Sequence, residues 1–170
     1  MAEISDSLWN EGISASDYGE GSEAYRAAVF EQYKLCVEMA DRVSARRNLT
    51  NTFFLTLNSG LVAFLGAWLA PVRLRDAPVL LLLAGLPVLL AICAAWWFTL
   101  RSYEQLNKGK WDVIGALEEQ LPTRAFSAAE WRSLGEGRDW RLYLRLTHVE
   151  RWIPVIFAGT YVLGFLALAL

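Results

Sequence analysis

The stretch Thr52-Phe-Phe-Leu-Thr-Leu-Asn-Ser-Gly-Leu-Val-Ala-Phe-Leu-Gly-Ala-Trp-Leu-Ala70 decides the fold of this chain, because it contains no Asp, Glu, Lys or Arg. Two further stretches, 78–100 and 152–170, share this property. Each is about 20 residues long, which is the length a helix needs to cross the roughly 30 Å hydrocarbon core of a bilayer. The sequence therefore predicts an all-α integral membrane protein with three transmembrane helices, at about 52–70, 78–100 and 152–170.

The overall composition agrees with this assignment. Hydrophobic residues make up 55% of the 170 residues, above the roughly 45–50% of a soluble domain, and the length allows one domain. A soluble globular protein and a disordered chain are therefore excluded. The net charge of −2 gives no argument for a nucleic-acid partner, and two cysteines cannot form a disulfide framework. Membrane lipid is the partner that the composition implies.

Positive charge is unevenly distributed around the three spans, and this asymmetry predicts orientation. In the loop between the first two spans, the only positively charged residues are Arg73 and Arg75. The segments at the opposite ends of the spans hold Lys34, Arg42, Arg46, Arg47, Arg101, Lys108, Lys110, Arg138, Arg141, Arg145 and Arg151. We therefore expect a multi-pass protein of a bacterial inner membrane, with a cytoplasmic N-terminus and the C-terminus at the outer face. The first 23 residues carry acids and no Lys or Arg, which excludes a secretory signal peptide.

The first span is expected to extend into the cytoplasm as a long helix. Residues 1–21 are rich in Gly, Ser and acids, and they predict either a flexible acidic arm or a segment that docks on a basic surface. The rest, 22–170, is expected to be a single helical membrane domain. No Gly or Pro interrupts residues 22–51, so this cytoplasmic helix should continue into the first span and reach about 47 residues.

Two more cytoplasmic helical segments are predicted between the second and third spans. The second span should continue over 101–121, where Pro122 ends it. In the segment 127–151, a capping-box pattern at Ser127 opens a short helix and two glycines break it. The last helix should then start near Asp139 and run into the third span. Together these extensions predict a cytoplasmic helical bundle.

The first span is unusual because amide and hydroxyl side chains lie at membrane depth. They are Asn51, Thr52, Thr56, Asn58 and Ser59. Polar groups that face lipid are costly, so these side chains should face protein or water. One interpretation is interhelical hydrogen bonding that holds the helices together, and the other is the lining of a polar path along the axis of an assembly.

Two further sets of residues on the first cytoplasmic helix are candidates for subunit interfaces. The charged set is either a solvated face or an ion network between subunits, and it comprises Glu38, Asp41, Arg42, Arg46 and Arg47. The apolar set forms a stripe at helical spacing, and it comprises Val29, Tyr33, Val37 and Ala40. A single chain of 170 residues offers no segment sufficient to cover this stripe, so we expect it to be buried partly between subunits.

No sequence motif indicates catalysis. His148 is the only histidine and has no second His or Cys near it, so it cannot form a zinc site. Gly-rich phosphate-binding loops and nucleophile-elbow patterns are absent from the sequence. We therefore expect neither an enzyme nor a cofactor.

Several stretches carry a resemblance to a known family. The first runs from Tyr33 through Lys-Leu-Cys-Val-Glu-Met-Ala-Asp-Arg-Val-Ser-Ala-Arg-Arg to Asn48 and is followed by Thr52-Phe-Phe-Leu-Thr-Leu-Asn58. The later pieces are Leu106-Asn-Lys108, Lys110-Trp-Asp-Val-Ile114, Leu121-Pro122, Glu130-Trp131 and Thr147-His-Val-Glu-Arg-Trp-Ile-Pro154. Over about residues 25–160 the chain resembles the RipA-like family of small bacterial inner-membrane proteins. The resemblance implies a homo-octamer with no established catalytic activity, and it implies no site residues.

Two functions fit these observations. The first is a membrane channel, pore or gated effector whose axis is lined by the first span. The alternative is a non-conducting oligomeric scaffold whose cytoplasmic ring recruits partners.

Overall fold

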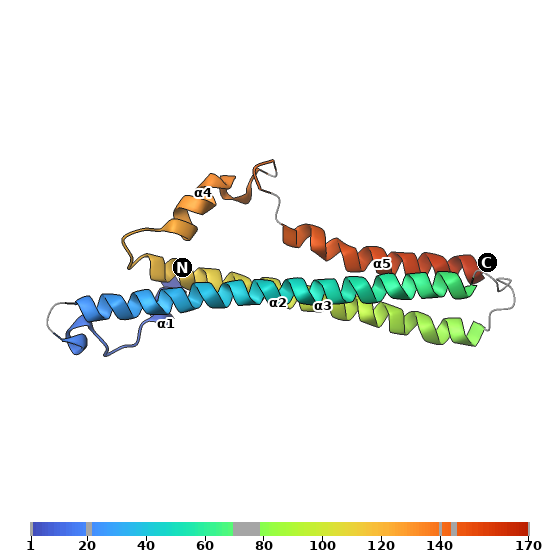
Figure 1. Cartoon of the computed structure of the whole chain (residues 1–170), viewed down its shortest axis with the longest axis horizontal. Coiled ribbons are helices and arrows are strands. Elements are labelled where there is room, and N and C mark those ends of the chain that lie inside the picture. The colour runs from blue at the N-terminus through green and yellow to red at the C-terminus, as the bar shows by residue number, and fades with distance from the viewer. Residues whose placement is uncertain (1, 20–21, 70–78, 140, 144–145, 170) are drawn as a thin grey trace. The chain divides into compact units, whose positions relative to one another are not determined.

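The computed structural model describes residues 2–19, 22–69, 79–139, 141–143 and 146–169 (Figure 1). Its helices are α1 (Ala2–Leu8), α2 (Glu23–Leu69), α3 (Val79–Glu118), α4 (Trp131–Ser133) and α5 (Leu146–Ala169). Short helical turns lie at Ala15–Tyr18, Ala125–Glu130 and Gly135–Gly137. Within the described ranges there is no β-strand, so the predicted all-α class is confirmed.

Three of these helices, α2, α3 and α5, are long and apolar enough to cross a membrane. This confirms the three predicted transmembrane helices. The loop between the first two spans falls within 70–78, outside the described residues.

Helix α2 is one uninterrupted helix of 47 residues, as predicted. It lacks proline throughout, and its first glycine is Gly60, so every backbone N–H of its interior can join the helical hydrogen-bond ladder. A helix of this length can contain both a polar segment and a membrane span.

The segment after α3 differs in part from the prediction. The short helix α4 forms and is followed by a break, because Gly135, Glu136 and Gly137 have φ values of 62°, 54° and 68°. Such left-handed backbone cannot continue an α-helix. However, the last helix begins at Leu146 and not near Asp139. The carboxylate of Asp139 accepts the backbone N–H of Arg141 at 2.9 Å, which stabilises a turn at that point in place of a helix.

The chain divides into two compact units, which we describe separately. The polar unit comprises residues 1–45 and 104–145, and the membrane unit comprises residues 46–103 and 146–170. In the polar unit, the buried apolar side chains are spaced 11 and 3 residues apart on α2 and 3 residues apart on α3, and they are Val29, Ala40, Val43, Ile114 and Leu117. This spacing puts them on one face of each helix.

The membrane unit is built from the apolar parts of α2, α3 and α5. On α3 its buried side chains are Cys93, Trp96 and Leu100, and Tyr161 is buried on α5. Many large apolar side chains of this unit are exposed instead, among them Phe53, Phe64 and Leu163. In a bilayer such side chains contact lipid or another protein, so their exposure agrees with a membrane environment.

Candidate functional site

Asn58 is at the centre of a polar cluster inside the membrane unit. Its side chain is 0% exposed. Its Nδ2 donates to the backbone oxygen of Phe54 at 2.9 Å. Its Oδ1 accepts the hydroxyl of Tyr161 at 3.0 Å and faces the thiol of Cys93, with Sγ at 3.6 Å. One amide therefore connects α2, α3 and α5.

A second hydrogen bond lies close to this amide along α2. The indole Nε1 of Trp96 donates to Oδ1 of Asn51 at 3.0 Å, and the ring is 0% exposed. The Trp96 ring stacks on Phe54, with centroids 5.7 Å apart and planes 9° apart, and contacts Phe157 at 6.0 Å. Aromatic packing and hydrogen bonding thus hold the same three helices together. We call Asn51, Asn58, Cys93, Trp96 and Tyr161 the polar cluster.

The other polar residues of the first span lie on a different face of α2. Thr52, Thr56 and Ser59 are exposed on the single chain, and we call them the hydroxyl stripe. Thr52 donates to the backbone oxygen of Asn48 at 2.9 Å, which satisfies its proton within the helix and leaves its oxygen outward. A helix turns about 100° per residue, so Asn51 and Asn58, which are seven residues apart, lie on the same face of α2. The hydroxyl stripe lies on a different face. The five polar candidates therefore form two groups.

The charged candidates do not form one network in a single chain. Arg42 donates to Glu38 at 2.6 Å, and both side chains are more than half exposed. Asp41 and Arg46 are also exposed. Such exposed pairs contribute little to stability. Their assignment to a subunit interface stays a prediction.

Arg47 forms an ion pair inside the membrane unit. Its Nε lies 3.6 Å from Oε2 of Glu150, and the two side chains are 15% and 9% exposed. Each charge is costly to bury alone, so the pair compensates both. The contact places this part of α2 against the start of the third span.

The apolar stripe is covered more fully by its own chain than we expected. Val29 and Ala40 are buried, at 6% and 1% exposure, and Tyr33 and Val37 are half-buried. The premise that one chain cannot cover this stripe is therefore wrong for Val29 and Ala40. The extension of α3 beyond its span lies beside this part of α2, as the hydrogen bond between Tyr33 and Glu118 shows, and it has buried apolar side chains of its own at Ile114 and Leu117.

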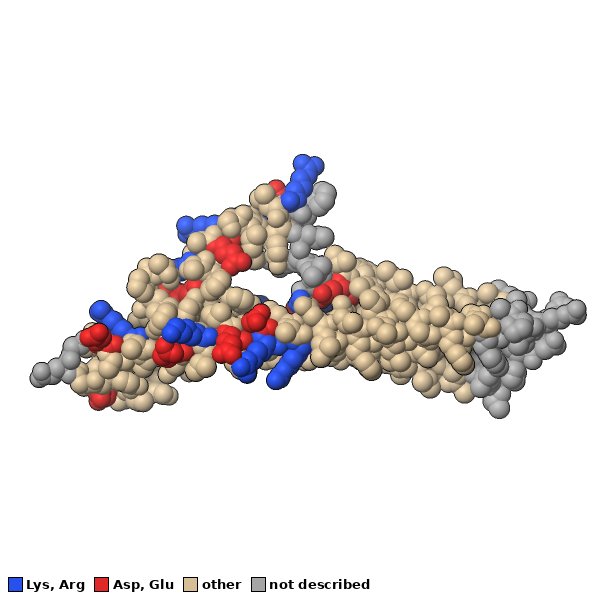
Figure 2. Space-filling model, in the orientation of Figure 1, with Lys and Arg blue, Asp and Glu red and all other residues tan. Residues whose placement is uncertain are grey.

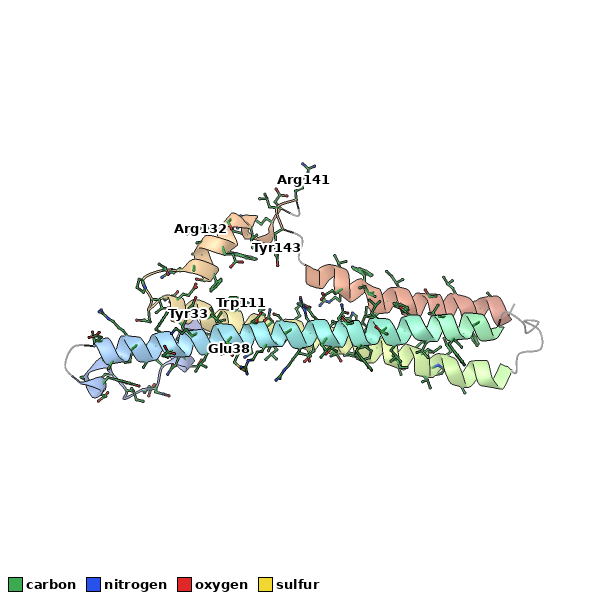
Figure 3. All side chains as sticks on the ribbon, in the orientation of Figure 1. Tyr33, Glu38, Trp111, Arg132, Arg141 and Tyr143 are labelled. Atoms are coloured by element: carbon green, nitrogen blue, oxygen red, sulfur yellow. The ribbon has the colours of Figure 1, made fainter. Side chains whose placement is uncertain are left out.

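The polar unit contains a buried carboxylate that sequence reasoning missed. Glu118 is 0% exposed at the end of α3. Its Oε1 accepts the hydroxyl of Tyr33 at 3.1 Å and the backbone N–H of Phe126 at 3.0 Å. Its Oε2 accepts the backbone N–H of Ser127 at 2.8 Å. We call this arrangement the Glu118 clamp, and Figure 3 labels Tyr33 within it.

The clamp changes the acidity of both partners. Burial opposes ionisation of Glu118, but hydrogen bonds from Ser127, Phe126 and Tyr33 outweigh it and lower the pKa of Glu118. Burial, together with the hydrogen bond to Glu118 and its charge, raises the pKa of Tyr33 to about 12. Glu118 therefore stays ionised and Tyr33 stays neutral around neutral pH.

The clamp also explains why the capping-box prediction at Ser127 is wrong. The helical turn begins at Ala125, and Arg124 precedes it without a side-chain cap. The carboxylate of Glu118 accepts the backbone N–H groups of Phe126 and Ser127, which lie eight and nine residues further along the chain. It thus takes the place of a local helix cap. The sequence signal that could have revealed this role is the position of Glu118 beside the apolar helix face of Ile114 and Leu117.

The residues that can be described contain no cluster of side chains typical of a metal site. No group of three or more His, Cys, Asp or Glu side chains in that part of the chain is placed to hold a metal ion. The side chain of His148 is outside the described set. Chemically, the polar cluster can link helices, and the hydroxyl stripe can face water or a neighbouring protein.

Comparison with known proteins relates this chain to a family of membrane proteins. A sequence model of the octameric membrane protein family (8xMP) matches residues 30–170. The matched region contains the polar cluster, the hydroxyl stripe and the Glu118 clamp, whereas α1 precedes it. Searches of curated proteins and of solved structures found no match.

Proposed function

This chain belongs to the octameric membrane protein family, and from this premise we propose that eight copies form a ring in a bacterial inner membrane and conduct ions along the ring axis. Family membership confirms the predicted resemblance to an octameric family of membrane proteins. The proposal adds that α2 lines the axis, that the N-terminus is cytoplasmic, and that the protein catalyses no reaction.

The hydroxyl stripe is the observation that carries the proposal. Thr52, Thr56 and Ser59 recur at four- and three-residue spacing and are exposed on the single chain. Three hydroxyls in a row on a lipid-facing surface would be unusual, because polar side chains in a membrane turn toward protein or water. A position at the axis of a ring gives all three a polar environment in every subunit.

The polar cluster indirectly supports an orientation of α2 in which the hydroxyl stripe faces the ring axis. The amides of Asn51 and Asn58 have partners on α3 and α5 within one subunit. These two residues therefore need no water-filled path, and they fix which face of α2 points away from its own subunit. That outward face includes the hydroxyl stripe.

Conductance of planar bilayers containing the purified octamer tests the proposal. Thr56→Leu should lower the single-channel current several-fold, because an apolar constriction at the axis excludes water. The matched control is Thr160→Leu on α5, since Thr160, like Thr56, is an exposed threonine of the membrane unit but lies on another helix. This control should leave the current unchanged.

Two results would contradict the proposal. The first is a wild-type octamer that passes no current under any voltage, pH or ionic condition, which would favour the non-conducting scaffold. The second is an equal effect of the two threonine variants on current while the oligomer keeps its size. In that case the stripe would not line the path.

A further inference from the structure

One end of the membrane unit carries a concentration of arginine. The ion pair between Arg47 and Glu150 places the middle of α2 at the same level as the start of α5. The hydrogen bond between Asn51 and Trp96 places Arg101 of α3, five residues beyond Trp96, near this level. Arg46 and Arg151 are the direct neighbours of the paired residues. We call Arg46, Arg47, Arg101 and Arg151 the basic end.

The positive charge of this end is compensated only in part. Among the described residues of 46–103 and 146–170, Glu150 is the single acidic residue. It pairs with Arg47. Arg46 and Arg101 are exposed, and neither forms an ion pair with a described residue. Figure 2 shows charged side chains at one end of the membrane unit and none on the rest of its visible described surface.

Aromatic side chains accompany the arginines. The guanidinium of Arg101 lies over the ring of Trp97, 5.4 Å from its centroid. Phe98 and Trp152 are 63% and 66% exposed next to the same end. Aromatic rings of this kind prefer the headgroup level of a bilayer, which places the basic end at the membrane surface.

We propose that the basic end binds anionic phospholipid, with Arg46 and Arg101 contacting the phosphate of the headgroup and Phe98 and Trp152 contacting the upper acyl chains. Guanidinium groups bind phosphate oxygens with two parallel hydrogen bonds, which an exposed, unpaired arginine is free to form. The chemistry selects the net negative headgroup of phosphatidylglycerol over the zwitterionic headgroup of phosphatidylcholine. This inference does not depend on conduction, because a non-conducting octamer would present the same end.

The test measures binding of fluorescent phosphatidylglycerol to the purified full-length octamer in neutral detergent. Unlabelled phosphatidylglycerol should displace the probe, whereas phosphatidylcholine should displace it much less. Arg46→Gln and Arg101→Gln should each weaken binding about fivefold, which is the fold-change for about 1 kcal/mol per basic side chain. Raising the salt concentration should reduce the difference between the two lipids.

The control is the pair Arg26→Gln and Arg124→Gln, because both arginines are exposed but belong to the polar unit. These changes should leave lipid binding unchanged. Oligomer size is checked for every variant. If a glutamine variant does not assemble, Arg46→Lys or Arg101→Lys is measured in its place. The lysine variants keep the positive charge, so they should retain the preference for phosphatidylglycerol over phosphatidylcholine. Equal displacement by both lipids, full binding in the Arg46→Gln and Arg101→Gln variants, or loss of that preference in the lysine variants would overturn the proposal. Displacement by inorganic phosphate as effective as that by phosphatidylglycerol would also overturn it, because the site would then bind free phosphate.

Discussion

Individual polar residues have different roles in this protein according to the face of the helix on which they lie. From sequence, Asn58 and Thr56 lie on neighbouring faces of the first span, and either side chain is expected to face protein or water. In the structure Asn58 is fully buried with partners on two other helices, and Thr56 is exposed. The structure thus favours interhelical hydrogen bonding for Asn58, and we assign only the hydroxyl stripe to the axis.

Replacing Asn58 should therefore affect stability more than transport. Asn58→Leu removes the acceptor for Tyr161 and leaves the hydroxyl of Tyr161 with only the more distant backbone oxygen at 3.3 Å. We expect a loss of about 1–2 kcal/mol of subunit stability. Thermal unfolding of the detergent-solubilised protein measures this loss, and Tyr161→Phe should reproduce much of it. An unchanged melting temperature together with a lower current would show instead that Asn58 faces the axis.

The Glu118 clamp predicts a specific response to acid. Its pKa is lower in the folded chain than the ordinary value of 4.5, so the folded state favours the ionised form. The resulting stability is present above about pH 4.5 and is lost as the pH falls through the lowered pKa. Glu118→Gln should lose about 1–3 kcal/mol at neutral pH, because a neutral amide cannot accept all three hydrogen bonds as well.

Protease resistance of the loop after α3 reports on the clamp. Cleavage near Phe126 should accelerate below pH 4.5 in the wild type, and in Glu118→Gln it should be fast already at pH 7. Glu119→Gln is the control, because Glu119 is the exposed neighbour. If the wild type and Glu118→Gln resist cleavage equally at pH 7, the carboxylate does not hold the loop.

At the scale of elements, the long helices were predictable and the connections were not. Helix α2 follows from local information, since an unbroken run without proline or early glycine needs no partner to define its limits. The turn at Ala125–Glu130 depends on a carboxylate from the preceding helix, and no local pattern encodes that contact. Likewise, the apolar periodicity of α2 indicated a buried face, but only the extent of α3 determined that the same chain buries it.

Helix α2 also has an apolar surface in the polar unit that its own chain leaves open. Leu35 and Met39 are one turn apart and are 58% and 43% exposed. Large exposed apolar side chains outside a membrane usually mark a contact with another protein, and the octamer supplies one. Leu35→Glu with Met39→Glu should therefore release smaller oligomers without unfolding the subunit.

Native size analysis and circular dichroism together decide this prediction. Gln32→Glu with Arg26→Glu is the matched control, because it adds negative charge at exposed polar positions of the same helix. An intact octamer in the Leu35 and Met39 variant would place the subunit contacts elsewhere.

For the molecule as a whole, three described helices are long and apolar enough to span a membrane and the chain belongs to an octameric family, so orientation is the next property to test. The asymmetry of Lys and Arg predicts that Gly109 is cytoplasmic and that the C-terminus is at the outer face. A reporter that is active only in the cytoplasm should be active when it is inserted at Gly109. A reporter that is active only in the periplasm should be active when it is fused after Leu170. The reverse pattern of activity would show that the orientation is the opposite one.

The polar cluster has a consequence for how the protein is made. Tyr161 follows Asn58 by 103 residues, so α2 and α3 are synthesised well before the hydroxyl that completes the cluster. During that interval the helical pair resides at the membrane with the amide of Asn58 bonded to Phe54 and Cys93 alone. Until α5 arrives, Oδ1 of Asn58 lacks the hydroxyl donor that it has in the complete chain. A chain interrupted before α5 would lack this hydrogen bond, so we expect its two membrane helices to be held together less firmly than in the complete chain.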